Sequence, residues 1–225
     1  MIPLRDSVRT HSLPLINLAI IVLNIYVFVH QLSLTDGELY NFVSTYGLIP
    51  ERFLSNLAAG SLQAALLPLF THQFLHGSWL HIGSNMLYLW IFGDNIEDRM
   101  GSLRYLVFYL LMGLIAGLTQ IAFNTQSLSP VIGASGAVAG ILGAYAVICP
   151  RARVLALVPV FLIFTVAEVP AMLFLGLWFV LQLFSGLTGI GVKVSVAWWA
   201  HIGGFLAGML LVRAFRRKSR YRPRE

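Results

Sequence analysis

Long apolar stretches separated by short polar segments run along almost the whole chain. Such stretches occupy residues 14–32, 79–96, 105–123, 135–150 and 195–212, and residues 154–186 are also predominantly apolar. A helix of about 20 apolar residues crosses the hydrocarbon core of a bilayer. The pattern therefore predicts an all-α, polytopic membrane protein in which transmembrane helices form a bundle.

The segment 33–78, between the first two predicted spans, is long and mixed in polarity. Its apolar run, residues 62–70, is nine residues long, which is too short to cross a bilayer as a helix. We expect this run to lie at the membrane interface, within a long loop.

The fourth predicted span is short. Pro130, Gly133 and Gly136 disfavour an earlier helix, so the span starts near Ser135 and ends at Pro150. About fifteen residues at 1.5 Å each rise only about 22 Å, which is less than the hydrocarbon thickness. The helix is therefore expected to begin inside the bilayer rather than at its surface.

Residues 154–186 allow two interpretations. They could hold one span after an interfacial stretch, or two short spans broken around Pro159, Glu168 and Pro170. Apolar content alone does not distinguish these arrangements, so the charges in the connecting loops must decide between them.

Lysine and arginine are distributed unevenly over the predicted loops. With one span in residues 154–186 the total is six and both termini lie on one side. Thirteen of the fifteen basic residues then share that side, and Arg52 and Lys193 lie on the other. This asymmetry fits the positive-inside rule, whereas seven spans would place the basic tail outside. We therefore expect six spans, cytoplasmic termini, and outer loops at 33–78 and 187–194.

Composition agrees with a membrane protein, because 58% of the 225 residues are hydrophobic and 11% are charged, with a mean hydropathy of +0.80. The start of the chain is too polar for a secretory signal, so the first apolar run is expected to be retained. Seven of the fifteen basic residues lie at 213–224, directly after an apolar span. There they favour contact with anionic lipid over nucleic-acid binding.

These patterns divide the chain into a cytoplasmic N-terminus (1–13), a six-span domain (14–213) and a basic cytoplasmic tail (214–225). The one cysteine, Cys149, excludes a disulfide within the chain and is expected to have a packing role.

Four polar residues fall at one depth in this topology. Ser135 begins the fourth span at its outer end, and His201 lies six residues into the last span. His81 and Asn85 lie in the first turns of the second span, which also begins outside. Polar and ionisable groups inside a membrane are costly and usually mark a function.

Packing offers a simpler explanation for some of these signals. Small residues at four-residue spacing, such as Gly136 and Gly140 or Gly204 and Gly208, commonly mark close contacts between membrane helices. A lone histidine such as His201 in such a seam could simply donate to a backbone carbonyl.

His81 and Asn85 lie four residues apart on one helix face and could likewise form interhelical hydrogen bonds. Packing must then explain four polar groups at one depth separately, whereas a catalytic site explains them together. Serine needs a general base when it attacks a carbonyl, and histidine serves near neutral pH. We therefore interpret Ser135 as the candidate nucleophile and His201 as the candidate base.

An acidic residue usually orients the histidine in such sites. None of the nine acidic residues falls in the outer half of the second, fourth or sixth predicted span. We therefore predict a dyad in which packing or a neutral partner orients His201. The Ser135 backbone N–H, the Asn85 amide and the His81 ring are the candidate donors to the oxyanion. This chemistry requires no metal or cofactor.

At these residues the chain resembles the rhomboid intramembrane proteases. The resemblance rests on His76, His81 and Asn85 at the start of the second span and on residues 93–101 (GDNIEDRMG) at its end. It continues with residues 133–136 (GASG) and 200–208 (AHIGGFLAG), and it covers nearly the whole chain. The resemblance implies that Ser135 is the nucleophile and His201 the base, and that His81 and Asn85 surround the oxyanion. Supporting roles are implied for His76, Gly133, Gly136 and Gly204.

The resemblance also implies a function and a place. It implies cleavage of membrane-spanning protein substrates near the outer leaflet of a lipid bilayer, in a water-accessible cavity reached laterally past span five and the first loop. The short termini resemble the minimal six-span form of the prokaryotic plasma membrane. One position differs, because Ala139 stands where some members have an aromatic residue that stacks on the catalytic histidine.

Three other functions are compatible with parts of the sequence. A metal site from His72, His76 and His81 is disfavoured because intervals of four and five residues, with Gly77 and Ser78 between, do not hold three ligands on one helix face, and no HExxH motif is present. A non-catalytic relative that binds membrane clients is disfavoured because both members of the dyad are present. A transporter is disfavoured because no pair of spans repeats a broken-helix pattern.

Overall fold

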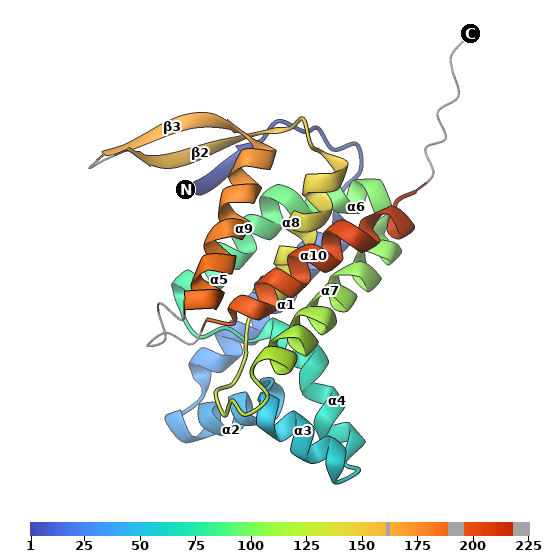
Figure 1. Cartoon of the computed structure of the whole chain (residues 1–225), viewed down its shortest axis with the longest axis vertical. Coiled ribbons are helices and arrows are strands. Elements are labelled where there is room, and N and C mark those ends of the chain that lie inside the picture. Colours follow the sequence, from blue (N-terminus) through green and yellow to red (C-terminus); the bar gives the residue numbers. More distant parts are fainter. Residues whose placement is uncertain (161–162, 189–195, 218–225) are drawn as a thin grey trace.

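The computed structural model of the chain describes residues 1–160, 163–188 and 196–217, which are mostly helical (Figure 1). Long helices run side by side in a bundle. A small β-sheet lies at one end of the bundle, and a group of short helices, α2 to α4, lies at the other.

Within the residues that the structure describes, four helices are long and apolar enough to cross a membrane. They are α1 (Leu15–Ser33), α7 (Ser102–Phe123), α9 (Ala171–Thr188) and α10 (Trp198–Phe215). Their outward faces carry exposed large apolar side chains, including Val22, Val107, Leu181 and Leu210, as expected for surfaces in contact with lipid. The chain is therefore a multi-pass membrane protein, and the count of six spans remains a prediction.

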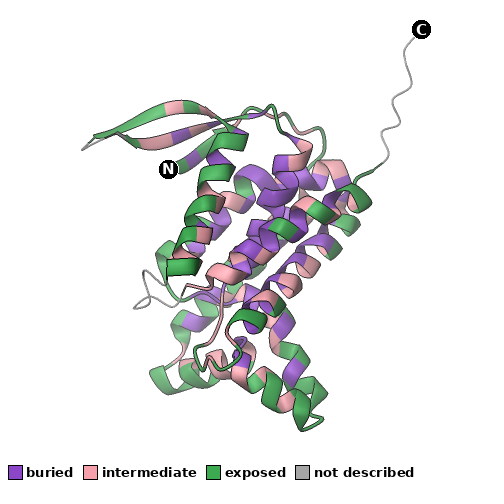
Figure 2. Ribbon diagram, in the orientation of Figure 1, coloured by how far each residue is buried: buried purple, intermediate pink, exposed green. Residues whose placement is uncertain are grey.

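The centre of the bundle is α8 (Ser135–Ile148), which is shorter than the four long helices and is buried from Gly136 to Ala146. Figure 2 shows burial concentrated in α8 and on the neighbouring faces of α7 and α10. The predicted helix start at Ser135 is confirmed. Gly133, two residues earlier, has φ 120°, a backbone conformation that is incompatible with an α-helix and that L side chains rarely adopt.

The second predicted span is a continuous run of three elements: α5 (Trp79–Tyr88), a π-helical turn η2 (Leu89–Gly93) and α6 (Asp94–Met100). It ends at Met100, four residues later than predicted, and is followed by Gly101, which has φ 81°. The side-chain amide of Asn17 on α1 donates to the carbonyl of Leu89, with an N···O distance of 2.9 Å. The carbonyl at the start of the π turn is therefore satisfied from the neighbouring helix.

Glu97 on α6 binds the first turn of α1, whose N–H groups have no partner within their own helix. Its two carboxylate oxygens accept from the N–H groups of Ile16 at 3.1 Å and Asn17 at 2.8 Å. The Ser102 hydroxyl donates to the same carboxylate at 2.6 Å. Glu97 is 1% exposed, and a negative charge at a helix N-terminus is favourable. Residues 93–101 thus join the first and second predicted spans.

The expectation of an all-α fold is wrong at one place. Strands β1 (Ile2–Asp6), β2 (Arg153–Val160) and β3 (Ile163–Pro170) form an antiparallel sheet in the order β1-β2-β3. Two apolar runs of strand length, interrupted by proline, pair with each other and with the N-terminal segment, which satisfies backbone groups that a broken helix would leave unpaired. The one span expected within residues 154–186 follows directly as α9.

The long loop after α1 contains α2 (Asp36–Tyr46), α3 (Pro50–Ala58), α4 (Leu62–Thr71) and the 3-10 turn η1 (His72–Phe74). The short apolar run predicted at 62–70 is α4, which has ten residues and contains Pro68. A β-bridge pairs Leu48 with Val131, so this loop contacts the segment that leads into α8.

Parts of three predictions fall outside the described residues. The predicted start of the last span at Ser195, most of the 187–194 loop and the end of the 214–225 tail belong to the stretches 189–195 and 218–225 that the structure does not describe. Within the described part, the last helix is α10, and it ends at the same end of the bundle as β1 (Figure 1).

Candidate active site

Ser135 and His201 meet at the interface between α8 and α10. The Ser135 Oγ lies 2.8 Å from the His201 Nε2, although the two residues are 66 positions apart in the sequence. Both residues are only partly buried. The pair has the distance that a nucleophile and its general base require.

Glycines allow α8 and α10 to approach this closely. A Cβ atom on Gly204 would overlap the backbone carbonyl of Gly136, and one on Gly208 would overlap that of Gly140. The backbones of the two helices are therefore in direct contact, as the small-residue spacing predicted. This contact sets the distance between the first residue of α8 and the second turn of α10.

Gln182 on α9 completes the contacts of the histidine ring. The Gln182 Oε1 lies 2.7 Å from the His201 Nδ1. The amide oxygen is an acceptor only, so a hydrogen bond at this contact requires the proton on Nδ1 and leaves Nε2 to accept from the Ser135 hydroxyl. No acidic residue in the described part of the chain bonds this ring. The sequence left packing or a neutral partner as the means of orienting His201, and the structure places the amide of Gln182 at the ring.

The sequence reasoning did not find Gln182. Its signal was present, because a lone amide side chain within the apolar run 171–184 is unusual in a membrane helix. The residue is 9% exposed, and its contact lies on another helix, 19 residues away in the sequence.

Two tryptophans flank the histidine ring in place of the missing aromatic on α8. The ring centroid of His201 lies 6.0 Å from that of Trp178 on α9 and 6.1 Å from that of Trp198 on α10. Ala139 itself is buried against the glycine contact between α8 and α10. The larger side chains that hold the ring therefore come from the other two helices.

The side chains of His81 and Asn85 lie beside the backbone that precedes Ser135. A Cβ atom on Gly133 would come within 2.5 Å of the His81 Nε2 and 3.7 Å of the Asn85 Nδ2. The His81 Nδ1 accepts from the Gly77 N–H at 3.4 Å, which leaves the proton on Nε2. Asn85 is buried, and its Nδ2 has no hydrogen-bond partner among the described residues. Two free N–H donors are therefore aimed at this segment.

His76 supports the same segment. Its Nε2 accepts from the Ala134 N–H at 3.4 Å, and its own backbone is held by the side chain of Gln31 through two hydrogen bonds of 3.0 and 3.2 Å. The Gly133 N–H donates to the carbonyl of His72 at 2.9 Å. The segment that precedes α8 is thus held by hydrogen bonds to residues of the long first loop.

The structure separates the histidines that could have formed a metal site. The His72 Nδ1 bonds the carbonyl of Pro68 at 2.9 Å, while the rings of His76 and His81 lie edge to face with centroids 5.0 Å apart. Within residues 1–160, 163–188 and 196–217, no three His, Cys, Asp or Glu side chains are grouped to hold a metal ion. The pair of Ser135 and His201 is therefore the candidate for catalysis.

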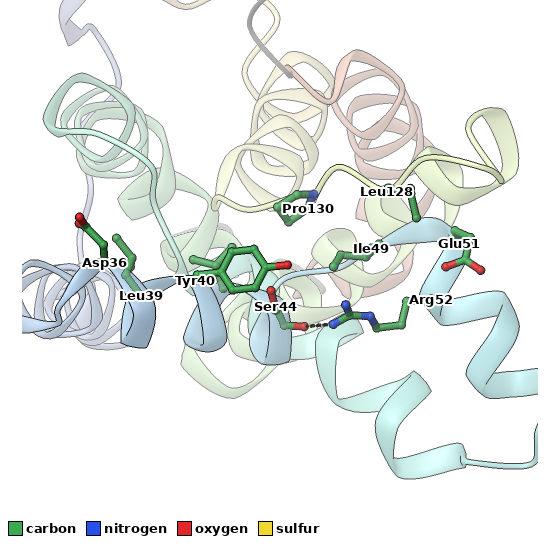
Figure 3. A pocket seen from close by; sticks show the side chains of 10 residues that line it. Asp36, Leu39, Tyr40, Ser44, Ile49, Glu51, Arg52, Leu128 and Pro130 are labelled. Carbon is green, nitrogen blue, oxygen red and sulfur yellow. Dashed lines mark hydrogen bonds between the residues drawn. The ribbon is translucent and has the colours of Figure 1, made fainter.

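A separate hollow of about 490 Å³ lies on the loop side of the bundle, between α2, α3 and the segment before α8 (Figure 3). Tyr40, Ser44, Glu51 and Arg52 line it, and the Arg52 guanidinium donates to the carbonyl of Ser44 at 2.7 Å. Neither Ser135 nor His201 borders this hollow, so it is not part of the candidate active site.

The chain is similar in sequence to known proteins. The Rhomboid domain family matches residues 63–218. Rhomboid protein 1, mitochondrial, of Saccharomyces cerevisiae is 26% identical over 198 residues, which cover 82% of this chain and 54% of that protein. RHOMBOID-like protein 5 of Arabidopsis thaliana is 33% identical over 139 residues, which cover 61% and 40% of the two chains.

A bacterial protein is also similar. Rhomboid protease GlpG of Klebsiella pneumoniae is 34% identical over 83 residues, which cover 37% of this chain and 29% of that protein. The matches to these three proteins cover about half of their length or less. The relatives include mitochondrial, plant and bacterial proteins, and the minimal prokaryotic type expected from the sequence stays a prediction.

Proposed function

The chain belongs to the rhomboid family, and on that premise we propose that it is an intramembrane serine endopeptidase with Ser135 as nucleophile and His201 as general base. The observation that carries the proposal is the 2.8 Å contact between the Ser135 Oγ and the His201 Nε2, with the Gln182 Oε1 2.7 Å from the Nδ1 of the same ring. An acceptor at Nδ1 favours the proton on that nitrogen, which leaves on Nε2 the lone pair that the base step requires.

The reaction follows from this arrangement. As the Ser135 Oγ attacks the scissile carbonyl carbon, its proton passes to the His201 Nε2. When the C–N bond of the tetrahedral intermediate breaks, the same Nε2 returns the proton to the departing amide nitrogen. Water then attacks the acyl-enzyme with the same two proton transfers and releases the new carboxyl terminus.

The oxyanion of each tetrahedral intermediate needs preorganised donors. The Ser135 N–H, at the first position of α8, has no carbonyl of its own helix to bond. The Asn85 Nδ2 has no hydrogen-bond partner in the described part of the chain, and the His81 Nε2 lies beside Gly133, with Nδ1 of the same ring accepting from Gly77. We assign these three groups to the oxyanion, with His76, Gly133, Gly136 and Gly204 holding the backbone that positions them.

The substrates we propose are membrane-spanning proteins, cleaved near the outer leaflet of a lipid bilayer. In six crossings, the continuous run α5–η2–α6 and the short helix α8 would join the four long helices. Ser135 would then lie below the outer membrane surface, and both termini would be cytoplasmic. The end of α10 lies at the same end of the bundle as β1 (Figure 1), which supports an even number of crossings. The location we propose is a prokaryotic plasma membrane.

A cleavage assay tests the activity. The purified protein, reconstituted in liposomes, is incubated with a panel of tagged single-span substrates beside its Ser135→Ala variant. We expect a cut within or near the membrane segment of at least one substrate, and none with the variant. Cleavage by both forms would exclude serine chemistry, while binding of a substrate by both forms without cleavage would favour a non-catalytic relative.

Cysteine labelling tests the topology. Cys149 is the chain's one cysteine, so single reporters can be placed in a Cys149→Ala background. A cysteine at Tyr40 should react with an impermeant reagent from outside, and one at Leu103 only after the membrane is opened. Equal accessibility of both from one side would contradict the proposed orientation.

A further inference from the structure

We infer that Gln182 is a positioning residue that selects the reactive tautomer of His201, the role that an acidic residue has in a Ser-His-Asp triad. The inference rests on the proposed function, because it assigns a part in the dyad to a third helix. Among the described residues, the Gln182 side chain bonds the Nδ1 of the base, which is not one of the reacting atoms.

Gln182 and Ser135 contact different nitrogens of the His201 ring. The Gln182 Oε1 and the Ser135 Oγ lie on opposite nitrogens of the His201 ring, at 2.7 and 2.8 Å. An oxygen at Nδ1 requires the proton there. Without an acceptor at Nδ1, the ring is free to carry its proton on Nε2 and to donate to the Ser135 hydroxyl, a state in which it cannot take the serine proton.

The surrounding packing holds the amide in place. On the same face of α9, one turn earlier, Trp178 and Phe179 contact Phe205 of α10 with ring centroids 5.9 and 4.8 Å apart. Beyond Leu175, Gln182 is the one buried residue of α9. Beside the position that reaches the histidine, α9 and α10 are therefore held together by an apolar contact of aromatic rings.

An amide suits this position better than a carboxylate. A buried charge in a membrane helix is costly unless it is paired, and the ring is neutral for most of the reaction cycle. The amide oxygen provides the acceptor without that cost.

A purely structural role for Gln182 is the alternative. In that case its hydrogen bond only joins α9 to α10, and the His201 ring keeps its tautomer without it.

The test compares Gln182→Leu, which removes the acceptor, with Gln182→Glu, which keeps an oxygen at the same reach. Nitrogen-15 spectra of histidine-labelled protein in nanodiscs report whether Nδ1 or Nε2 of His201 carries the proton. We expect Nδ1–H in the wild type and in Gln182→Glu, and a mixture of tautomers in Gln182→Leu. The kcat of Gln182→Leu should fall by between about 10-fold and 10⁴-fold, the upper figure being the loss known for a wrong tautomer in a triad. Its KM should change little.

Gln120 offers a matched control. It is also a glutamine that is 9% exposed, and its Oε1 accepts from the Ala200 N–H at 3.2 Å, next to the histidine but not on its ring. Gln120→Leu should lower thermal stability and leave the tautomer unchanged. An unchanged tautomer and kcat in Gln182→Leu would overturn the inference.

These experiments distinguish failure of the inference about Gln182 from failure of the proposed function. If Ser135→Ala retains the cleavage activity of the wild type, the serine-protease proposal fails, and the spectra still report the tautomer of His201. If Ser135→Ala is inactive and Gln182→Leu is fully active with Nδ1–H retained, the proposal stands and only the role of Gln182 is lost. Should Gln182→Leu unfold, Gln182→Met, which keeps the length of the side chain without an oxygen acceptor, replaces it in both measurements.

Discussion

The backbone carbonyl of Gly136 lies against the Cα of Gly204, so closely that a methyl group on Gly204 would overlap it. Each residue lies within a turn of a member of the dyad. The distance between Ser135 and His201 is therefore set by two glycines that take no part in the chemistry, and any atom added between them must separate α8 from α10.

Gly204→Ala is expected to reduce both stability and turnover. Overpacking of this kind costs about 1–3 kcal/mol, and a shift of about 1 Å at the dyad can cost about 10²-fold in rate. Thermal unfolding and cleavage rates on one preparation measure both effects. Gly176→Ala on α9 is the control, because a Cβ there meets no atom within 4 Å; equal behaviour of the two variants would contradict the proposed contact.

Ser135→Ala and His201→Ala should each reduce cleavage by about 10⁴-fold or more, and the double variant should be no slower than either one, because members of a catalytic unit are not additive. Rates are measured at saturating substrate, with circular dichroism to verify the fold. In the same assay a fluorophosphonate should label Ser135, and a chelator should have no effect. Losses that multiply in the double variant would show that the two residues act separately.

Asn85→Ala should lower kcat by about 10²–10³-fold, the usual effect of removing one oxyanion donor, with little change in substrate binding. An interhelical hydrogen bond in a membrane is worth only about 0.6 kcal/mol on average. If Asn85 had only that role, the variant would lose a little stability and keep its kcat. Asn24→Ala is a matched control, because Asn24 is a buried asparagine on α1 whose amide donates to Ile20 at 2.7 Å, remote from the dyad.

Asp6, the last residue of β1, should make stability depend on pH. Burial raises the pKa of its carboxyl above the ordinary 3.8, although the Tyr145 hydroxyl that donates to it opposes this shift. The folded state therefore binds the proton more tightly than the unfolded state. The stability contributed by this group is complete below the unfolded pKa and is lost as the pH rises through the folded value.

The corresponding measurement compares thermal unfolding of the wild type and Asp6→Asn across the acidic range. The advantage of the wild type over the variant should decrease as the pH rises from about 4 towards neutrality, since asparagine does not titrate and its oxygen still accepts from Tyr145 and Asn95. A difference that increases with pH would mean that the folded state prefers the carboxylate.

Much of the helical framework could be predicted from the sequence because its determinants are local. Pro130 and Gly133 forbid a helix before Ser135, and the apolar stretches of α1 and α7 have the length of a bilayer. The polar groups of the site were also visible, because His81, Asn85, Ser135 and His201 stand out in apolar surroundings. These signals require no knowledge of the partner helix.

The rest depends on contacts between distant segments. Residues 153–170 are apolar runs of strand length that only pairing with Ile2–Asp6 distinguishes from short helices. Gln182 is significant because α9 turns it towards His201, which neither its type nor its spacing reveals. The binding of Glu97 to α1 likewise joins residues 80 and 81 positions apart, beyond any periodicity along one helix.

That link between Glu97 and Asn17 has a consequence for biosynthesis. The ribosome delivers the first span long before residue 97, so the N-terminal turn of α1 enters the membrane without the carboxylate that later binds it. The first turn of α1 therefore acquires this partner only once α6 has emerged, and a nascent chain arrested before Glu97 holds α1 by its hydrophobicity and by bonds to earlier residues, such as that of Asn17 to Leu89. The N-terminal turn of α1, the first helix to be synthesised, thus receives its hydrogen-bond acceptor from the later helix α6.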